Sequence, residues 1–468
     1  MPLAFSYRLR EVVEIHQGQE GLWLFCPHTG GLASWKSTRP LPMVQALSRD
    51  WLDQEEMANR FAPGQADPAN PSFQLFFLRL VSAGLLDLRV QAEGKLVFRV
   101  SPAPAEEALR WSEDAAAAPL RLNRFAYIRS QAGGLLLESP LTPHRLWLGR
   151  TPLMALVDDL ARGHAIPAPD EGEAACLALM LNLGLAEPAT TPEDDDPLAY
   201  WEFHDLLFHA RSLAGRHVYP KGGTYRFVGR RPSLPVVKQA SALEAVELPR
   251  SSVEMAARLE APLARVLEAR RSQRNFDPRP LTLEELGAFL HASARVQKVM
   301  HRRQHQEDLS FRPYPSGGAR HPLEIYPVVR RCQGLTEGAY HYDPLRHALE
   351  PVASEPKALA ELLSDNPHHL EGPQPPQVSL YLAARLGRTA WKYQSIAYKV
   401  INQDLGGLYQ TFYLVATALG LAPCAVGNLD ASGVGKALGL DWRGEPVVGL
   451  FTLGSPPELD TQTESRAP

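Results

Sequence analysis

A stretch rich in proline and aspartate, EPATTPEDDDPLAY at residues 187–200, divides the chain into two regions with different sequence patterns. Proline and clustered carboxylates disfavour helix and strand, so this stretch is typical of a linker. The chain has 468 residues, which is enough for two to four domains of about 100–200 residues each. The sequence therefore predicts separate N-terminal and C-terminal regions, each with its own hydrophobic core.

The N-terminal region contains a weak internal repeat of a strand pair followed by two helical patterns. The strand pairs are GLWLFCPHTGGLASWK at residues 21–36 and GLLLESPLTPHRLWL at residues 134–148. In both copies the second helical pattern ends at a glycine, Gly84 or Gly184, where a helix C-cap is expected. The segment LLDLRVQAEGKLVFRV after the first copy predicts a hairpin wing. We therefore expect two winged-helix-like modules, residues 1–115 and 116–194, followed by an arm at residues 195–250.

Winged helices often bind DNA, but the candidate recognition segments here, FQLFFLRLVSAG and EAACLALMLNLG, carry few cationic side chains to meet phosphates. The net charge of −4 also gives no bulk attraction to nucleic acid. We therefore expect no nucleic-acid partner and interpret the modules as a peptide clamp that can take up an extended peptide by strand addition. A purely structural packing role is the alternative.

Sequence signals of secretion, membrane insertion and metal binding are weak. The N-terminus lacks the apolar core of a signal peptide, and no apolar run approaches the ~20 residues of a membrane helix. His301 and His305 have the spacing of a zinc pair, but the HExxH glutamate is absent, so we expect a solvated, mobile loop there. The four cysteines lie far apart and predict reduced thiols in a cytoplasmic protein: Cys26, Cys176, Cys332 and Cys424.

From residue 251 onward helical and strand patterns alternate, which predicts an α+β domain at residues 251–468. The segment VEMAARLEAPLARVLEARRSQRNF has helical periodicity, and Thr282 with Glu285 forms a capping box at the start of the next helix. A long helix with one buried face is expected from about residue 392 to Gly420. Four segments predict strands: PLEIYPVVRRC, GAYHYDPLRHALEPV, PQVSLYLAARL and VVGLFTLG.

Two segments of this domain suit a phosphate or a flat ring. Guanidinium groups and a hydroxyl crowd together in EARRSQRNF, at Arg270, Arg271, Ser272 and Arg274, and a phosphate needs this combination of donors. A solvated basic helix end is the simpler alternative. In FRPYPSGGARHPLEIYPVV the small residues Ser316, Gly317 and Gly318 would let a ring or a phosphate approach backbone N–H groups. A surface turn is the alternative there.

A third segment, TAWKYQSIAYK at residues 389–399, places Lys392 and Tyr393 side by side at the expected start of the long helix. A packed tyrosine and a solvated lysine would be an ordinary structural arrangement. A second pair, Tyr398 and Lys399, follows at once and is interpreted as structural.

Taken together, the RRSxRxF start, the RPxPSGGARHPLEIY loop and strand, the GAYHYDP turn and the long helix ending in ALGLAP resemble the FMN-dependent nitroreductase-like superfamily. More narrowly, they resemble its SagB/McbC-type branch, the azoline dehydrogenases, and cyanobactin thiazoline oxidases in particular. WEFHDLLFHARS and KGGTYRF are also similar to this branch. The resemblance covers residues 195–460 and rests on architecture over the first 190 residues. It implies a central mixed sheet flanked by helices, and a homodimer with FMN at the subunit interface.

The resemblance also implies roles for individual residues. Arg270, Arg271, Ser272 and Arg274 match the stretch that holds the FMN phosphate and ribityl chain, and Lys392 and Tyr393 match the catalytic pair. The remaining cofactor-binding positions are the loop from the other subunit, Pro315, Ser316, Gly317 and Gly318; the segment beside the isoalloxazine ring, Ala425, Val426 and Gly427; and a basic tail residue near the phosphate, Arg466.

The implied reaction is the oxidation of peptide thiazolines or oxazolines to thiazoles or oxazoles, with O2 as the expected electron acceptor. One hydrogen leaves as a hydride to flavin N5, and the other leaves as a proton to a base. Tyrosine, with an unperturbed pKa of ~10, needs a nearby ammonium such as Lys392 to lower its pKa, and Lys392 as the base is the open alternative. Adjacent helical residues diverge by ~100°, so the helix must start irregularly if both side chains act on one substrate.

Two other functions fit the same motifs less closely. One is a general NAD(P)H-dependent nitroreductase or flavin reductase, which would not need a peptide clamp. The other is a non-catalytic scaffold that binds a leader peptide.

Overall fold

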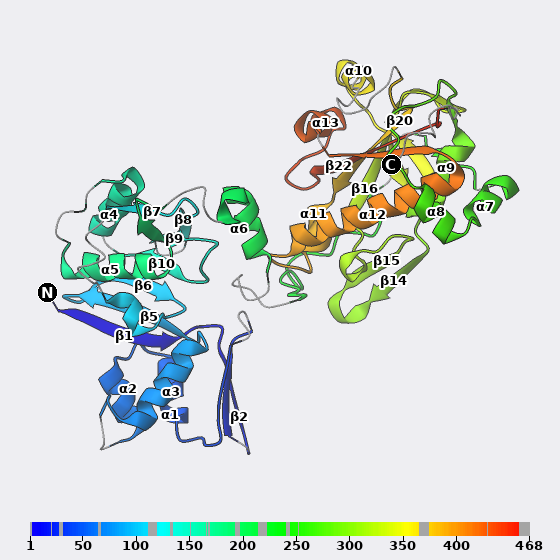
Figure 1. Cartoon of the computed structure of the whole chain (residues 1–468). Coiled ribbons are helices and arrows are strands. Elements are labelled where there is room, and N and C mark those ends of the chain that lie inside the picture. The colour runs from blue at the N-terminus through cyan, green and yellow to red at the C-terminus, as the bar shows by residue number, and fades with distance from the viewer. Residues whose placement is uncertain are drawn as a thin grey trace. The chain divides into compact units, whose positions relative to one another are not determined.

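The structure, a computed structural model, describes residues 2–457 except 20, 28–30, 64–66, 111–118, 132–133, 150, 165, 167–168, 192–196, 214–221, 240–243, 251, 365–373 and 428. The chain divides into two compact units, Met1–Gly222 and Gly223–Pro468 (Figure 1). In the part of the chain that the structure describes, no helix is both long enough and apolar enough to span a bilayer.

The first unit is built on one six-stranded antiparallel sheet that both halves of the sequence repeat share. The two halves meet where β6 pairs with β10. The spatial order is β1 (Leu3–Leu9), β5 (Leu86–Ala92), β6 (Lys95–Ser101), β10 (Arg145–Leu148), β9 (Gly134–Glu138) and β8 (Tyr127–Gln131). The strands β5 and β6 form the hairpin that the wing sequence predicts.

The same order of elements occurs twice in this unit. A three-stranded meander precedes helices and a return strand in each copy. The first copy has β2 (Glu14–Gly18), β3 (Gly21–Phe25), β4 (Leu32–Trp35), α1 (Leu41–Leu47), α2 (Gln54–Phe61) and α3 (Pro71–Ser82). The second has β8, β9, β10, α4 (Thr151–Arg162) and α5 (Glu171–Asn182), and its return strand β11 (Ala186–Pro188) pairs with β7 (Leu120–Leu122). Short 3-10 turns are η1 (Glu106–Leu109) and η3 (Pro197–Tyr200).

Capping residues fix the ends of the long helices, as the sequence predicts. Gly84 (φ 63°) and Gly184 (φ 67°) adopt the left-handed conformation just after α3 and α5. The N–H groups of Leu85 and Leu185 then donate to the carbonyls of Leu80 and Met180 at 3.0 and 2.8 Å. These six-to-one bonds satisfy carbonyls that have no partner within the helix.

Among the described residues of the first unit, one hydrophobic cluster contains side chains of both copies. Its buried members run from Tyr7 and Leu9 in β1 to Leu185 and Ala186 near the end of the second copy. Because one core serves both copies, neither copy is packed as an isolated module.

The second unit is a seven-stranded sheet covered by helices on both faces. Its order is β12 (Val246–Glu247), β19 (Ala348–Pro351), β18 (Gly338–Asp343), β16 (Leu323–Val329), β20 (Val378–Ala384), β22 (Val447–Gly454) and β21 (Ala422–Val426). Four of the strand predictions, over β16, β18–β19, β20 and β22, are confirmed. The strand β21 was not predicted.

Within the described residues every neighbouring pair in this sheet is antiparallel, so the expectation of a mixed sheet is corrected. The strands β20 and β21 run in the same direction, as a helical crossover between them requires. However, β22 lies between them and pairs antiparallel with both. Parallel pairing occurs instead in the small sheet of β13 (Leu281–Thr282) and β17 (Cys332–Gln333).

Alternate side chains of the strands pack into two separate clusters, which makes this unit three-layered. One cluster joins the sheet to α9 (Leu283–Ala294) and α12 (Ala397–Leu419), with the rings of Phe289 and Phe412 5.0 Å apart. The other joins it to α10 (Pro356–Ser364) and α13 (Ala431–Ala437). Figure 1 shows these two helix pairs on opposite faces of the sheet.

Two helix predictions need correction. The expected helix beginning at residue 253 is split into α7 (Val253–Leu259) and α8 (Leu263–Ala269), because Pro262 cannot donate within a continuous helix. The long helix α12 begins at Ala397 rather than near residue 392, after the short helix α11 (Leu386–Ala390). The capping box of Thr282 and Glu285 on α9 is confirmed.

Residues 298–311 form a hairpin of β14 (Lys298–Arg302) and β15 (Glu307–Phe311), joined by η4 (Arg303–His305), and not the expected mobile loop. The last short turn is η5 (Gly317–Ala319).

The predicted arm is divided between the units. Its helix α6 (Phe203–Arg211) bonds to the first unit through Arg211, and residues 231–236 accept hydrogen bonds from the second.

Candidate active site

The Ser316–Gly318 loop lies between β15 and β16 and is fixed by a carboxylate on α12. Ser316 Oγ donates to Asp404 Oδ2 at 2.6 Å, and the Gly317 N–H donates to Asp404 Oδ1 at 2.9 Å. The His321 N–H donates to Ser316 Oγ at 2.8 Å and closes the loop on itself. Burial raises the pKa of the Asp404 carboxyl, although the two hydrogen bonds from the loop oppose this change.

Both glycines of this loop are required by close neighbours. A Cβ added to Gly317 would lie 2.3 Å from Val400 Cγ1. A Cβ on Gly318, whose φ is +64°, would lie 2.3 Å from Tyr393 Oη and 3.0 Å from Lys392 Nζ. The structure therefore brings the loop and the Lys-Tyr pair together, although they are about 75 residues apart in the sequence.

The two adjacent side chains can both reach Gly318 because the chain between α11 and α12 is not helical. The Thr224 and Tyr225 N–H groups donate to the Lys392 carbonyl at 2.8 and 3.2 Å, which holds this turn from outside the helix. Ser395, with φ of 54°, reverses the chain before α12 begins. The irregular start that a shared site requires is therefore confirmed.

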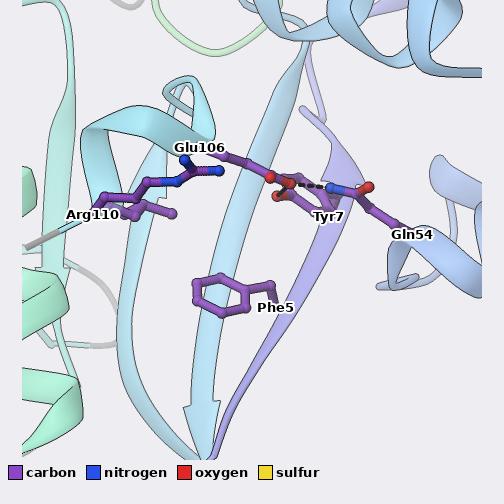
Figure 2. A pocket seen from close by; sticks show the side chains of 6 residues that line it. Phe5, Tyr7, Gln54, Glu106 and Arg110 are labelled. Atoms are coloured by element: carbon purple, nitrogen blue, oxygen red, sulfur yellow. Dashed lines mark hydrogen bonds between the residues drawn. The ribbon is translucent and has the colours of Figure 1, made fainter. Parts of the chain in front are cut away.

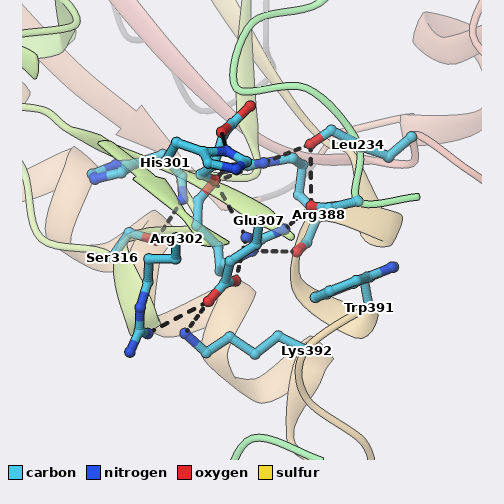
Figure 3. A network of polar contacts seen from close by, with 12 residues as sticks. Leu234, His301, Arg302, Glu307, Ser316, Arg388, Trp391 and Lys392 are labelled. Carbon is cyan, nitrogen blue, oxygen red and sulfur yellow. Dashed lines mark hydrogen bonds and ion pairs between the residues drawn. The ribbon is translucent and has the colours of Figure 1, made fainter. Parts of the chain in front are cut away.

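Lys392 is buried, and its ammonium pairs with the Glu307 carboxylate (Figure 3). Its Nζ lies 3.5 Å from Glu307 Oε1. The same atom lies 5.5 Å from the ring centre of Tyr225 and 5.6 Å from that of Tyr393, within range of cation–π attraction. The Tyr225 ring also stacks on His305, with ring centres 3.9 Å apart.

The surroundings of Tyr393 favour its neutral phenol over the phenolate, because they raise its pKa. Burial raises its pKa, the charge of Glu307 raises it further, and Arg320 opposes this increase without cancelling it. The expectation that Lys392 would lower this pKa is therefore corrected. The Lys392 ammonium pairs with Glu307, and the charge of Glu307 itself raises the pKa of Tyr393.

A second group of predicted residues meets around Tyr413 on α12. Ser272 Oγ and Tyr413 Oη lie 2.8 Å apart, and the Ala425 N–H donates to Tyr413 Oη at 2.8 Å. The Arg270 guanidinium lies 5.3 Å from the ring centre of Tyr413. The Gln273 N–H donates to the Pro423 carbonyl at 2.8 Å, which holds the segment that contains Arg274 beside β21.

The other predicted cofactor positions differ in what they contact. Arg271 Nη1 donates to the carbonyls of Glu268 and Arg270, so it caps the end of α8. Pro315 packs against Gly407. Val426 is buried in the hydrophobic cluster beneath α13, Gly427 is exposed, and Arg466 lies outside the described residues.

The glycine loop, which contacts Asp404, and the Ser272 segment, which contacts Tyr413, lie on opposite faces of α12. Asp404 and Tyr413 are nine residues apart, which is about two and a half turns and about 13.5 Å along the axis. One chain therefore presents the glycine loop with the Lys-Tyr pair in one place, and the Arg270–Arg274 segment in another.

Each group fits a part of FMN. In the part of the chain that the structure describes, Arg270 and Arg274 have no carboxylate partner, so their charges are available to a phosphate. The glycine loop carries no side chains toward Lys392 and Tyr393, so the two polar atoms lie directly against its backbone, and a flat ring could approach that backbone as closely. Among the described residues no cluster of His, Cys, Asp and Glu could hold a metal ion.

The first unit has a pocket of 380 Å³ beside β1 and η1 (Figure 2). The Gln54 amide and the Tyr7 hydroxyl both donate to Glu106 Oε1, so the polar groups of the pocket pair with one another. Phe5 and Leu109 supply its apolar surface.

Comparison with known proteins agrees with this architecture. Residues 267–455 match the Nitroreductase family, and residues 120–218 match the family of the cyanobactin oxidase ThcOx. The nitroreductase-like protein MJ1384 of Methanocaldococcus jannaschii is 34% identical over 168 residues, covering 36% of this chain and 79% of that protein. The chain belongs to the nitroreductase family.

Two further proteins show weaker similarity. The microcin B17-processing protein McbC of Escherichia coli is 34% identical over 139 residues, 28% of this chain and 50% of McbC. A solved nitroreductase-like structure from Anabaena variabilis is 16% identical, with a TM-score of 0.38 over 97% of this chain and 80% of that one.

Four residues of the site were not found from the sequence: Tyr225, Glu307, Asp404 and Tyr413. Each contacts a predicted residue across a long sequence separation, such as the 85 residues between Glu307 and Lys392. The only local signal was the KGGTYRF segment that contains Tyr225.

Proposed function

We propose that the protein is an FMN-dependent oxidase that converts thiazolines or oxazolines in a peptide into thiazoles or oxazoles. The observation that carries this proposal is the convergence of Lys392 Nζ and Tyr393 Oη on Gly318. A simple flavin reductase needs only the cofactor loop, whereas removal of a carbon-bound proton needs proton-handling groups beside it. The similarity to McbC and to the cyanobactin oxidase family supports a role in peptide maturation.

FMN, when bound, supplies the two-electron acceptor that takes a hydride at N5. The chain supplies the rest. Arg270, Ser272 and Arg274 would hold the phosphate and ribityl chain, and the Ser316–Gly318 backbone would face the ring. Lys392 and Tyr393 bind the substrate beside that ring and manage the proton that leaves the carbon next to the peptide carbonyl. O2 is the proposed final electron acceptor.

We infer that two copies of the chain build each complete site. The glycine loop and the Arg270–Arg274 segment contact opposite faces of α12, about 13.5 Å apart along its axis. A single FMN reaches both kinds of group more readily if one copy supplies the arginines and the other supplies the loop. Such a homodimer is the simplest closed assembly.

The peptide substrate is proposed to bind the first unit along β4. This strand is the outer strand of its three-stranded sheet, so one edge of its backbone is open to strand addition. Three adjoining hollows of 740, 610 and 400 Å³ lie between β4 and α3. Exposed Leu75 and Leu78 offer apolar contacts, and Lys36, Arg39 and Arg79 supply positive charge. An extended peptide with apolar and acidic side chains fits this groove.

A general NAD(P)H-dependent nitroreductase is the second candidate, favoured by the similarity to MJ1384. One experiment separates the two. Purified protein is loaded with FMN and incubated in air with a thiazoline-bearing peptide, and mass spectrometry follows the loss of about 2 Da per ring oxidised. Loss of mass supports the oxidase. An unchanged peptide, together with rapid NAD(P)H consumption on nitroaromatics, supports the nitroreductase, and failure to bind FMN removes both.

A further inference from the structure

The proposed reaction assigns no role to the carboxylate of Glu307. Glu307 is the first residue of β15, and its side chain is fully buried. Arg320 Nη1 donates to Glu307 Oε2 at 2.7 Å, and Lys392 Nζ donates to Oε1 at 3.5 Å (Figure 3). Arg302 Nη1 reaches the same Oε1 at 3.5 Å from the partly exposed strand β14.

The two carboxylate oxygens of Glu307 contact different cations. Oε2 is taken by the buried guanidinium of Arg320, which also donates to the Arg388 carbonyl at 2.7 Å and is fixed in the core. Oε1 faces Lys392, which is the buried cation beside Gly318. Burying the Lys392 ammonium without a counter-ion would be costly, so the carboxylate compensates a charge that the site retains.

The groups that face Lys392 come from every element around it. The aromatic rings of Tyr225 and Tyr393 lie 5.5 and 5.6 Å from its Nζ, and both favour a cation. The charged and titratable groups that surround the Lys-Tyr pair are Glu307 and Arg302 of the hairpin, Arg320 after η5, Asp404 of α12, and Tyr225. Glu307 is the carboxylate in this set that pairs with Lys392.

We propose that Glu307 is a positioning residue that keeps Lys392 protonated and aimed at Gly318, so that Lys392 serves as a hydrogen-bond donor and Tyr393 accepts the proton. This inference rests on the proposed function and assigns the roles within its Lys-Tyr pair. The Lys392 ammonium donates to the carbonyl oxygen of the substrate and stabilises the negative charge that develops there.

The bonds and electrons balance with these roles. The C–H bond next to the carbonyl breaks, its proton passes to the phenolate oxygen of Tyr393, and its electron pair forms the new double bond of the ring. The hydride leaves the neighbouring ring carbon, and its two electrons reduce FMN. Glu307 takes no part in bond making and acts only through Lys392.

The charge of Lys392 can be measured without any turnover. Competitive acetylation of the amine over a range of pH, read by peptide mass spectrometry, gives the midpoint at which Lys392 loses its proton. Glu307→Gln removes the counter-charge, and this midpoint should fall by about one to three pH units. Because Glu307→Gln also removes a partner of Arg320, Glu307→Asp is the second variant. It keeps the negative charge in the buried site, but its shorter side chain lengthens the contact with Lys392.

Two controls separate a local effect from a general one. Asp308→Asn changes the neighbouring carboxylate, which pairs with His301 and not with Lys392, and should leave the midpoint unchanged. Lys399 in the same samples should keep its own midpoint in every variant. Thermal melting shows which variants are folded.

The same variants are then assayed for azoline oxidation. Glu307→Gln and Glu307→Asp should lower kcat by at least about tenfold when the assay pH lies one pH unit above the new Lys392 midpoint, with FMN still bound. In a Lys392→Met background, Glu307→Gln should have no further effect on single-turnover flavin reduction, because its target is absent.

If the Lys392 midpoint is the same in wild type and in both folded Glu307 variants, the inference is wrong. An equal further loss of rate in the Lys392→Met background would also overturn it. If the midpoint falls as expected but wild type oxidises no azoline, the proposed function fails while the assignment of charge to Lys392 stands.

Discussion

Gly318→Ala is the substitution that probes the candidate site most selectively. The added methyl group would lie 2.3 Å from Tyr393 Oη and 3.0 Å from Lys392 Nζ, whereas ordinary contacts begin near 3.4 Å. The Tyr393 hydroxyl must therefore retreat by about 1 Å, and a displacement of this size in a catalytic group can cost about a hundredfold in rate. The left-handed φ of +64° adds about 1–2 kcal/mol of backbone strain.

The assay is the mass loss of a thiazoline peptide, with FMN content and melting temperature measured on the same samples. Gly439→Ala is the matched control, because Gly439 has φ of +66° with no atom near the added Cβ. It reproduces the strain without the clash and should turn over normally. Wild-type kcat in folded Gly318→Ala would refute the argument that Lys392 and Tyr393 work against this glycine.

Three further outcomes follow from the same contacts. Because burial raises the pKa of Tyr393, log kcat should rise with a slope near one from about pH 7 to about pH 9, and a profile that is flat over this range would exclude its phenolate as the base. Arg274→Gln should weaken FMN binding by about ten- to a hundredfold in fluorescence titration, since charged hydrogen bonds contribute about 1.5–3 kcal/mol, whereas exposed Arg443→Gln should not. Arg79→Glu should weaken binding of an acidic peptide by about tenfold in fluorescence anisotropy, whereas Lys95→Glu, away from the β4–α3 groove, should leave it unchanged.

Much of the fold was predictable because its signals are local. The capping box of Thr282 and Glu285 and the glycine ends of α3 and α5 each depend on a few adjacent residues. Short apolar runs likewise located β16, β20 and β22. The joining of the two repeats through β6 and β10 could not be predicted, since nothing in either strand identifies the other as its partner.

The candidate site, like the fold, was predictable where its signals are local and not where they depend on distant residues. The glycine loop and the Lys-Tyr pair were predictable from short motifs, and the structure brings them into contact. The start of α12 was misplaced because hydrogen bonds from Thr224 and Tyr225 hold Lys392 in a turn that its own sequence does not specify. Glu307 and Asp404 were missed for a related reason. A single buried carboxylate has no sequence pattern, and its importance depends on partners 85 and 88 residues away.

The central claim is that Lys392 and Tyr393 perform azoline oxidation beside FMN. The most direct measurement is the mass of a thiazoline peptide after incubation with wild type, Lys392→Met and Tyr393→Phe, each loaded with FMN. The account predicts a loss of about 2 Da per ring with wild type and a loss at least about a hundredfold slower with either variant, at equal FMN content. Equal mass loss with all three proteins, or none with FMN-loaded wild type, would contradict it.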